Sequence, residues 1–308
     1  MAQRLTRDEF DVLVEAVRRW HPGQDAAVPA VADIDATVTA AALAQSHTGQ
    51  VIALGRPWPV EPAVDNLRPA MQYMAMTGDT LWPGDVEPTG YMDFIGVAYH
   101  GKTVSHIDAF NHIAYRGKLF GGVDAAHVTH ARGMSAGDVT IYGPLVTRGV
   151  LLDMADVAGL AWTEPGHAWT LAEIQQALAS TGTTLRTGDA LLFRSGHDRR
   201  RAELGPWDAD AAAAGVHVSA IPWLIEQGVR IFGADGETDV RPSPVEGVTL
   251  PVHVLTLTMA GIPLLDNLAL EDLGNACRQH GQSTFTLSVS PLNIPGGTGS
   301  PVNPVAIL

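Results

Sequence analysis

Two histidines and an aspartate that could bind a metal ion lie within seven residues of one another, in the pattern His106-x-Asp108-x-x-x-His112. If residues 106–108 are extended, His106 and Asp108 project from the same face, because side-chain direction in a strand repeats every two residues. A helical turn beginning at about Asp108 would bring His112 to that side as well, since residues four apart are neighbours on a helix. Two imidazoles and a carboxylate suit zinc or another divalent ion. The spacing therefore predicts a metal site rather than three unrelated polar residues.

Other polar residues farther along the chain could join such a site. His253 lies in an otherwise apolar run that we interpret as a strand, and a buried histidine there needs a partner, of which a metal ion is one kind. Asp266 follows in the sequence and could bind the ion or cap a turn. Asp235 and Asp239 flank Gly236 at the predicted C-terminal end of a strand, where open α/β sheets place ligands. A polar turn would explain these two aspartates equally well.

Strand-like and helix-like segments alternate around these candidates. Helices are predicted at residues 6–17, 35–45, 170–180, 222–227 and 271–280, the first and third with capping-box residues. Strands are predicted at residues 51–54, 91–99, 146–153, 187–194, 229–233 and 285–289, and around His253. Residues 56–90 are rich in proline without a sustained period, which favours a site-forming loop or a subunit arm. We therefore predict one α/β domain with a mixed sheet.

Charge and cysteine content limit the partners and the compartment. The formal charge is −14, from 33 acidic and 19 basic residues, which argues against nucleic acid or an anionic membrane as partner. Cys277 is the only cysteine, so no disulfide can form within the chain and a reducing compartment fits best. No apolar run approaches the ~18 residues needed to span a membrane, and the N-terminus leads directly into a charged helix. We expect a cytoplasmic protein that acts on a small molecule.

The run His100-Gly-Lys-Thr-Val-Ser-His106-Ile-Asp108-Ala-Phe-Asn-His112 resembles the signature of the cyclase-like metal-dependent hydrolases, a family that includes bacterial kynurenine formamidases and isatin hydrolase. The likeness covers the chain from about residue 48 to the end, through residues 148–153, 188–194, 251–253, 263–268 and 295–304. It implies a swivelling β/β/α fold with a mixed sheet as a single domain at residues 48–308. Residues 1–47 would then form an N-terminal helical extension, and the protein would be a homo-oligomer, dimer or tetramer.

The resemblance also implies a set of ligands. His106, Asp108 and His112 would bind Zn²⁺ or Mn²⁺, one or two ions per subunit. His253 would close the site from a second strand, and Asp266 stands about where family members have a glutamate or glutamine ligand.

The formamidases have a catalytic histidine four residues after the last signature histidine, and here that position is Arg116. An arginine cannot accept a proton at neutral pH, but its guanidinium can donate two hydrogen bonds to an acidic substrate or an oxyanion. We therefore expect Arg116 to orient such a substrate while another group acts as the base. The candidates for that base are His100, His127, His130 and Asp235.

These residues favour metal-dependent hydrolysis of a small-molecule amide, lactam or N-formyl compound, a kynurenine formamidase-like reaction at a non-peptide C–N bond. Lactone hydrolysis, or ring closure at the same metal, is a second hypothesis. A third is a non-catalytic, metal-containing small-molecule-binding protein, which the replacement at Arg116 favours. Met71, Tyr73, Met74 and Trp82 could pack in the core or receive an apolar or aromatic substrate.

Overall fold

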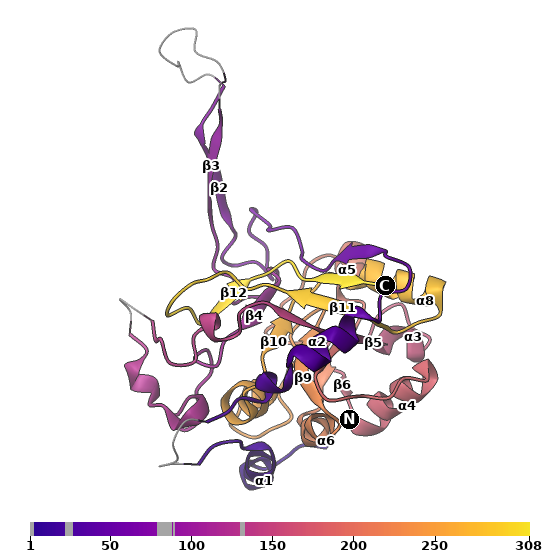
Figure 1. The fold of residues 1–308 in the computed structure, drawn as a ribbon. Coiled ribbons are helices and arrows are strands. Elements are labelled where there is room, and N and C mark those ends of the chain that lie inside the picture. The colour runs from indigo at the N-terminus through magenta and orange to yellow at the C-terminus, as the bar shows by residue number, and fades with distance from the viewer. Residues whose placement is uncertain (1–2, 22–26, 79–87, 89, 130–132) are drawn as a thin grey trace.

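The computed structural model describes residues 3–21, 27–78, 88, 90–129 and 133–308. Its centre is a nine-stranded sheet in the order β1–β13–β11–β5–β7–β9–β10–β4–β12 (Figure 1). The strands are β1 (Val51–Ala53), β4 (His106–Asp108), β5 (Leu145–Asp153), β7 (Asp189–Arg194), β9 (Val229–Ala234), β10 (Leu264–Asp266), β11 (Thr284–Val289), β12 (Gly299–Pro301) and β13 (Val305–Ile307). Neighbours among β5, β7, β9 and β10 run parallel, and the remaining pairs run antiparallel. The predicted α/β fold with a mixed sheet is confirmed.

The parallel strands form the buried middle of the sheet. Every residue of β7 and β9 is buried, and β5 is buried through Val150, Leu151 and Leu152. Helices cover both faces of a parallel sheet, so its strands read as nearly continuous apolar runs instead of alternating ones. This is the pattern that made residues 146–153, 187–194 and 229–233 recognisable as strands from the sequence.

Helices pack around this sheet (Figure 1). The α-helices are α1 (Arg7–Val17), α2 (Ala36–Leu43), α3 (Met154–Val157), α4 (Leu171–Thr181), α5 (His197–Leu204), α6 (Ile221–Glu226), α7 (Pro251–His253) and α8 (Glu271–His280). Short 3₁₀ turns lie at Ala30–Asp33, Phe120–Gly122, Ala125–His127, Val139–Ile141 and Val218–Ala220. The capping boxes predicted for the first and third of the five predicted helices are present, at Thr6 with Glu9 and at Thr170 with Glu173. None of the helices in the described ranges is long and apolar enough to cross a membrane.

The N-terminal helices pack closely on the rest of the protein. Phe10 and Val14 of α1 are buried in the common core, and the Trp20 indole N–H donates to the Thr258 carbonyl at 2.7 Å. The division into an extension at residues 1–47 and a domain at residues 48–308 stays a prediction.

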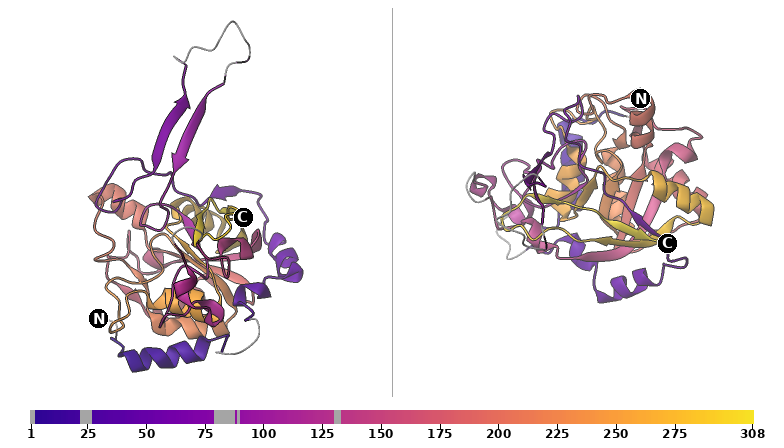
Figure 2. Two further views of the ribbon diagram at one scale, coloured as in Figure 1. Left: turned by 90° about the vertical axis from the view of Figure 1, so that its left-hand side faces the viewer. Right: turned by 90° about the horizontal axis from the view of Figure 1, so that it is seen from above.

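Part of the proline-rich stretch is regular, which corrects the prediction of an irregular segment. Strand β2 (Met71–Met76) pairs antiparallel with β3 (Met92–Gly96), and this hairpin projects from the body (Figures 1 and 2). Both faces of β2 are exposed, so the apolar–polar alternation that marks a half-buried strand is missing. Met71, Tyr73 and Met74 are exposed and do not pack in the core. Trp82 lies outside the described residues. A further short parallel pair joins β6 (Ala168–Trp169) and β8 (Gly215–Val216).

The strand predicted around His253 is wrong. His253 is the last residue of α7, and the chain continues into a π-helix, η6 (Val254–Ala260), that is buried throughout. A helix buried on all sides has no polar face, so its period disappears from the sequence and a run of Val, Leu and Thr looks like a strand. Pro251 occupies the first helical position, where its missing N–H costs nothing.

Candidate metal centre

The signature residues lie on β4 and in the turn that follows it. Strand β4 sits between β10 and β12, with His106 opposite Asp266 and Asp108 opposite Gly299. The predicted extended conformation of residues 106–108 is confirmed, and His106 and Asp108 point to the same side. After Asp108 the chain turns tightly, with the His112 N–H donating to the Ala109 carbonyl at 3.1 Å, so a single turn replaces the predicted start of a helix.

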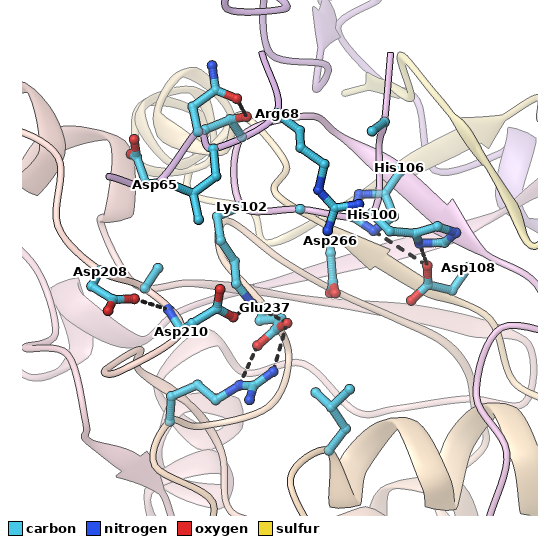
Figure 3. A pocket seen from close by; sticks show the side chains of 18 of the residues that line it. Asp65, Arg68, His100, Lys102, His106, Asp108, Asp208, Asp210, Glu237 and Asp266 are labelled. Carbon is cyan, nitrogen blue, oxygen red and sulfur yellow. Dashed lines mark hydrogen bonds and ion pairs between the residues drawn. The ribbon is translucent and has the colours of Figure 1, made fainter. Parts of the chain in front are cut away.

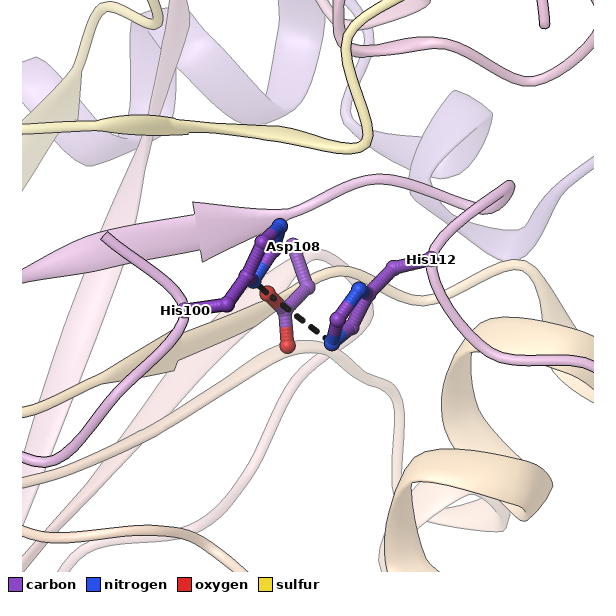
Figure 4. A group of neighbouring side chains, drawn as sticks. All are labelled: His100, Asp108 and His112. Atoms are coloured by element: carbon purple, nitrogen blue, oxygen red, sulfur yellow. Dashed lines mark ion pairs between the residues drawn. The ribbon is translucent and has the colours of Figure 1, made fainter. Parts of the chain in front are cut away.

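Asp108 is the centre of a ring of imidazoles. Its Oδ1 lies 3.0 Å from His100 Nδ1 and 3.4 Å from His106 Nε2. His112 Nε2 is 4.0 Å from the same oxygen, and His253 Nε2 is 3.3 Å from Oδ2 (Figure 4 shows His100, Asp108 and His112). Asp108 is 1% exposed, and neither carboxylate oxygen has a well-oriented hydrogen bond from any described residue. A buried carboxylate in this state needs a cation, so the residues present fit a metal ion.

Two overlapping groups could hold an ion. His100, Asp108 and His112 form one, and His106, Asp108 and Asp266 form the other, with the ligand atoms of each group within 4.8 Å of one another. Asp108 belongs to both, and a carboxylate has two oxygens to share. The arrangement is therefore compatible with one ion or two.

The protonation states suit metal binding. Burial raises the pKa of Asp108, but the nearby imidazoles of His112, His100 and His253 outweigh it and hold that pKa well below the usual range. Burial lowers the pKa of His112 to about 4. Asp108 is thus a carboxylate and His112 a neutral imidazole at neutral pH, the forms in which both are ligands. Burial lowers the pKa of His253, but the neighbouring carboxylates of Asp108 and Asp239 raise it well above its usual value. Its surroundings favour a positive charge, which an ion would supply.

A second layer of hydrogen bonds orients two of the histidines. The Nδ1–H of His106 donates to the Val104 carbonyl at 2.8 Å, and that of His253 donates to Asp239 Oδ2 at 2.6 Å. Both rings therefore turn Nε2 toward Asp108. Contacts of this kind fix the tautomer and orientation of metal-binding histidines. The sequence predicts Asp239 to lie at the end of a strand, either in a ligand site or in a polar turn, but no sequence signal connects it with His253.

Asp266 reaches the same place from β10. Its Oδ2 lies 3.5 Å from His253 Nε2, and its Oδ1 accepts hydrogen bonds from the backbone N–H and the hydroxyl of Thr238. The structure thus brings all five predicted ligands together. His100, a candidate for the catalytic base, lies beside them and contacts Asp108. The Nε2 of His100 forms a hydrogen bond with Thr298 Oγ1 at 2.9 Å, and its ring stacks on His112 with centroids 3.8 Å apart.

Arg116 and Asp235 do not lie in this pocket. The Arg116 side chain is exposed and pairs with Asp11 at 2.5 Å. Asp235 is buried beneath the first turn of α5. Its carboxylate accepts hydrogen bonds from the backbone N–H groups of Ser195, Gly196 and His197, of which Gly196 is the N-cap residue of α5. Burial raises the pKa of Asp235 to about 6 in spite of these bonds. The geometry makes Asp235 a helix cap, and Arg116 is not among the residues that line the pocket.

The two remaining candidates for the base do not enter the pocket either. His127 is exposed and does not line it, and His130 lies outside the described residues.

A pocket of about 330 Å³ opens beside the ring of imidazoles (Figure 3). Glu237 lies across it from Asp108, where it is paired with Lys102 and with Arg241, whose Nε donates to it at 2.8 Å. Burial raises the pKa of Glu237, but Lys102 and Arg241 outweigh this and bring it to about 2. The sequence analysis did not assign these wall residues, although Lys102 lies within the signature run and Glu237 lies between Asp235 and Asp239. Their pairing joins segments that are far apart in the chain, and no local pattern indicates it. Further lining residues are Val64, Leu67, Arg68, Ala98, Ile113, Asp208, Asp210 and Leu250.

The sequence and the fold were compared with those of known proteins. Residues 72–240, more than half of the chain, match the family model Cyclase, described as "Putative cyclase". A comparison with curated proteins finds no match. Among solved structures, the crystal structure of a novel cyclase is 27% identical, with a TM-score of 0.84 over 96% of this chain and 99% of that chain.

Structures of isatin hydrolase A share the fold at lower identity. The enzyme from Labrenzia aggregata, bound to benzyl benzoate, is 21% identical, with a TM-score of 0.59 over 83% of this chain and 93% of that chain. The enzyme from Ralstonia solanacearum is 22% identical, with a TM-score of 0.55 over 87% of this chain and 94% of that chain. The family match at residues 72–240 contains β4, the signature residues His100, His106, Asp108 and His112, and also Asp239, which orients His253. The chain belongs to the cyclase family.

Proposed function

We propose that the protein is a metal-dependent hydrolase of a small-molecule amide, lactam or N-formyl compound. The observation that carries the proposal is Asp108, a buried carboxylate that has no well-oriented hydrogen bond from the described residues and is surrounded by four imidazoles. His106, Asp108, His112, His253 and Asp266 would hold Zn²⁺ or Mn²⁺, because imidazole nitrogen and carboxylate oxygen are ligands that both ions accept. A structural role for the ion alone would not require the adjoining pocket of about 330 Å³.

A bound divalent ion in such a site polarises a carbonyl group and lowers the pKa of water toward 7. The chain supplies the remaining parts of the reaction. His100 is the proposed proton-transfer group: it is a quarter exposed, it faces the pocket, and the Thr298 hydroxyl fixes its ring. Asp239 holds His253 in one tautomer. The buried pairing of Lys102 with Glu237 gives the far wall a fixed arrangement of charge.

Fold similarity to isatin hydrolases, together with the family match, supports hydrolysis at a carbonyl carbon. The test is turnover of a panel of N-formyl amides, cyclic imides and lactones by the metal-loaded protein, before and after dialysis against a chelator. We expect chelator-sensitive cleavage of at least one C–N substrate. Turnover of lactones alone would favour the lactonase or cyclase alternative. Full metal occupancy without any turnover would favour a non-catalytic binding protein.

We also infer that the chain forms a homo-oligomer through the β2–β3 hairpin. A lone two-stranded hairpin has little stability of its own in water. This one carries exposed Met71, Tyr73, Met92 and Phe94, and the rings of Tyr73 and Phe94 stack with centroids 5.1 Å apart. A second copy of the chain would remove this apolar surface from water.

A further inference from the structure

Arg68 differs from the other cationic side chains that line the pocket. Lys102 is paired with Glu237 and lies 3.0 Å from Asp210, and Arg241 is paired with Glu237. Arg68 makes no hydrogen bond, ion pair or ring contact with any residue in the described part of the chain. Figure 3 shows its side chain extending into the pocket, toward the end where His100 and Asp266 lie. A guanidinium has five N–H donors, and none of those of Arg68 donates to a residue that the structure describes.

The loop that carries Arg68 is anchored immediately before it. Asp65 is 2% exposed in its side chain and pairs with Arg201 of α5 at 2.5 Å. The buried Asn66 side chain donates to the Glu61 carbonyl at 2.7 Å and accepts a hydrogen bond from the Thr103 hydroxyl at 3.2 Å. The next residue after Arg68 is a proline, which restricts Arg68 itself to extended backbone conformations. Arg68 is therefore an exposed cation without a partner among the described residues, and the loop that carries it is anchored through Asp65 and Asn66.

We propose that Arg68 binds a carboxylate on the substrate, so that the enzyme selects an acid over its uncharged analogue; this inference rests on the proposed function and specifies its substrate class. The planar guanidinium fork matches a carboxylate with two parallel hydrogen bonds. Arg68 and the metal ligands line one pocket of about 330 Å³, at the size where a small molecule fills the space between them. A substrate carboxylate held by Arg68 would therefore lie near the metal-binding end of the pocket, with the substrate carbonyl facing the ring of imidazoles.

A neutral substrate would make poor use of this pocket. It would cover a guanidinium without giving it an acceptor, and burying an unpaired charge is costly. Two aspartates that line the pocket, Asp208 and Asp210, do not compensate, since neither lies within ion-pair distance of Arg68. Asp210 is already paired with Lys102. The role that the sequence predicted for Arg116 is thus taken by an arginine from another loop.

The direct test is binding of benzoate and of benzyl alcohol to the metal-loaded protein by titration calorimetry. The variants are Arg68→Met, which removes the charge and keeps an unbranched chain, and Arg68→Lys, which keeps the charge without the fork. The control is Arg199→Met on the exposed face of α5, where Arg199 pairs with Glu203. Any direct contact of benzoate with the metal is common to the wild type and the three variants. The ratio of the benzoate affinity of each variant to that of the wild type therefore reports the contribution of Arg68.

Arg68→Met should weaken benzoate binding about 10-fold to 100-fold, the range for a hydrogen-bonded charge pair, and leave benzyl alcohol unchanged. The benzoate affinity of Arg68→Lys should lie between those of Arg68→Met and the wild type, and that of Arg199→Met should equal the wild-type affinity. Equal benzoate affinity in Arg68→Met and wild type would overturn the assignment. Hydrolysis of N-formylanthranilate and formanilide is measured separately. If neither is cleaved, the hydrolase proposal fails, while the benzoate ratio still decides the role of Arg68.

Discussion

Replacing Asp239 by asparagine tests whether the second layer of the site controls the first. The side chain keeps its size, but one acceptor oxygen becomes an N–H₂ donor. In the wild type, Asp239 Oδ2 accepts from His253 Nδ1 at 2.6 Å and from the His253 backbone N–H at 3.1 Å, while Oδ1 accepts from the Val252 N–H at 2.8 Å. All three donors are buried, so the new amide must face at least one of them donor to donor.

Either orientation of the asparagine harms the site. If its N–H₂ faces Nδ1, His253 must carry its proton on Nε2, where the metal needs a lone pair. If its oxygen stays there, the N–H₂ opposes the Val252 N–H, leaving a buried donor without an acceptor at a cost of about 1–3 kcal/mol. Loss of such an outer-layer partner weakens metal binding about 10-fold to 100-fold, equivalent to about 1.4–2.8 kcal/mol. We expect a weakening within that range.

The assay is competition for Zn²⁺ between the protein and a chromophoric chelator, with thermal unfolding of the same samples. The matched control is Asp235→Asn, four residues earlier, which also exchanges a buried acceptor of backbone N–H groups for an amide. This control should lose about 1 kcal/mol of stability through the weakened cap of α5 and keep its metal affinity. If Asp239→Asn bound Zn²⁺ as tightly as the control does, Asp239 would not orient His253 for a metal.

Three further results are expected. His100→Gln should lower kcat about 10²-fold to 10⁴-fold at unchanged metal content by elemental analysis, whereas loss of metal would make His100 a ligand instead. Glu237→Gln should reduce the loss of folding stability at acid pH, measured by chemical denaturation. The pKa of Glu237 is about 2, below the ordinary 4.5, so the ionised side chain stabilises the fold by about 3 kcal/mol above pH 4.5. This stabilisation disappears as the pH falls through 2. A variant with the same acid limb as the wild type would refute that. Tyr73→Ser combined with Phe94→Ser should reduce the oligomer to monomer in light scattering, and an unchanged mass would show that the hairpin is not the interface.

The local parts of the site could be predicted from the sequence. His106 and Asp108 are two residues apart in a short strand, and His112 follows in the next turn, so their convergence depends on backbone geometry within seven residues. His253 and Asp266 are distant, and they were assigned through residue type and the family resemblance. For His253 the residue was assigned to the site while its helix was mistaken for a strand, because full burial removes the period that distinguishes the two.

The sequence analysis put Arg116 in the pocket and did not find Arg68, because the position of each side chain depends on a turn or on contacts with distant segments. Arg116 was assigned by counting along the motif, but it has a φ of 49° in a turn closed by hydrogen bonds between Tyr115 and Lys118, and its side chain leaves toward Asp11. Arg68 enters the pocket from a loop 38 residues before His106, held there by contacts with α5. No local pattern encodes contacts of that kind.

The central claim is that Asp108 and its ring of imidazoles bind a catalytic metal ion. The most direct measurement is elemental analysis of the purified protein and of its Asp108→Ala variant, with circular dichroism to confirm that both are folded. We predict one or two equivalents of Zn²⁺ or Mn²⁺ per chain in the wild type and less than about a tenth of that in the folded variant. Equal metal content in the two proteins would contradict the account.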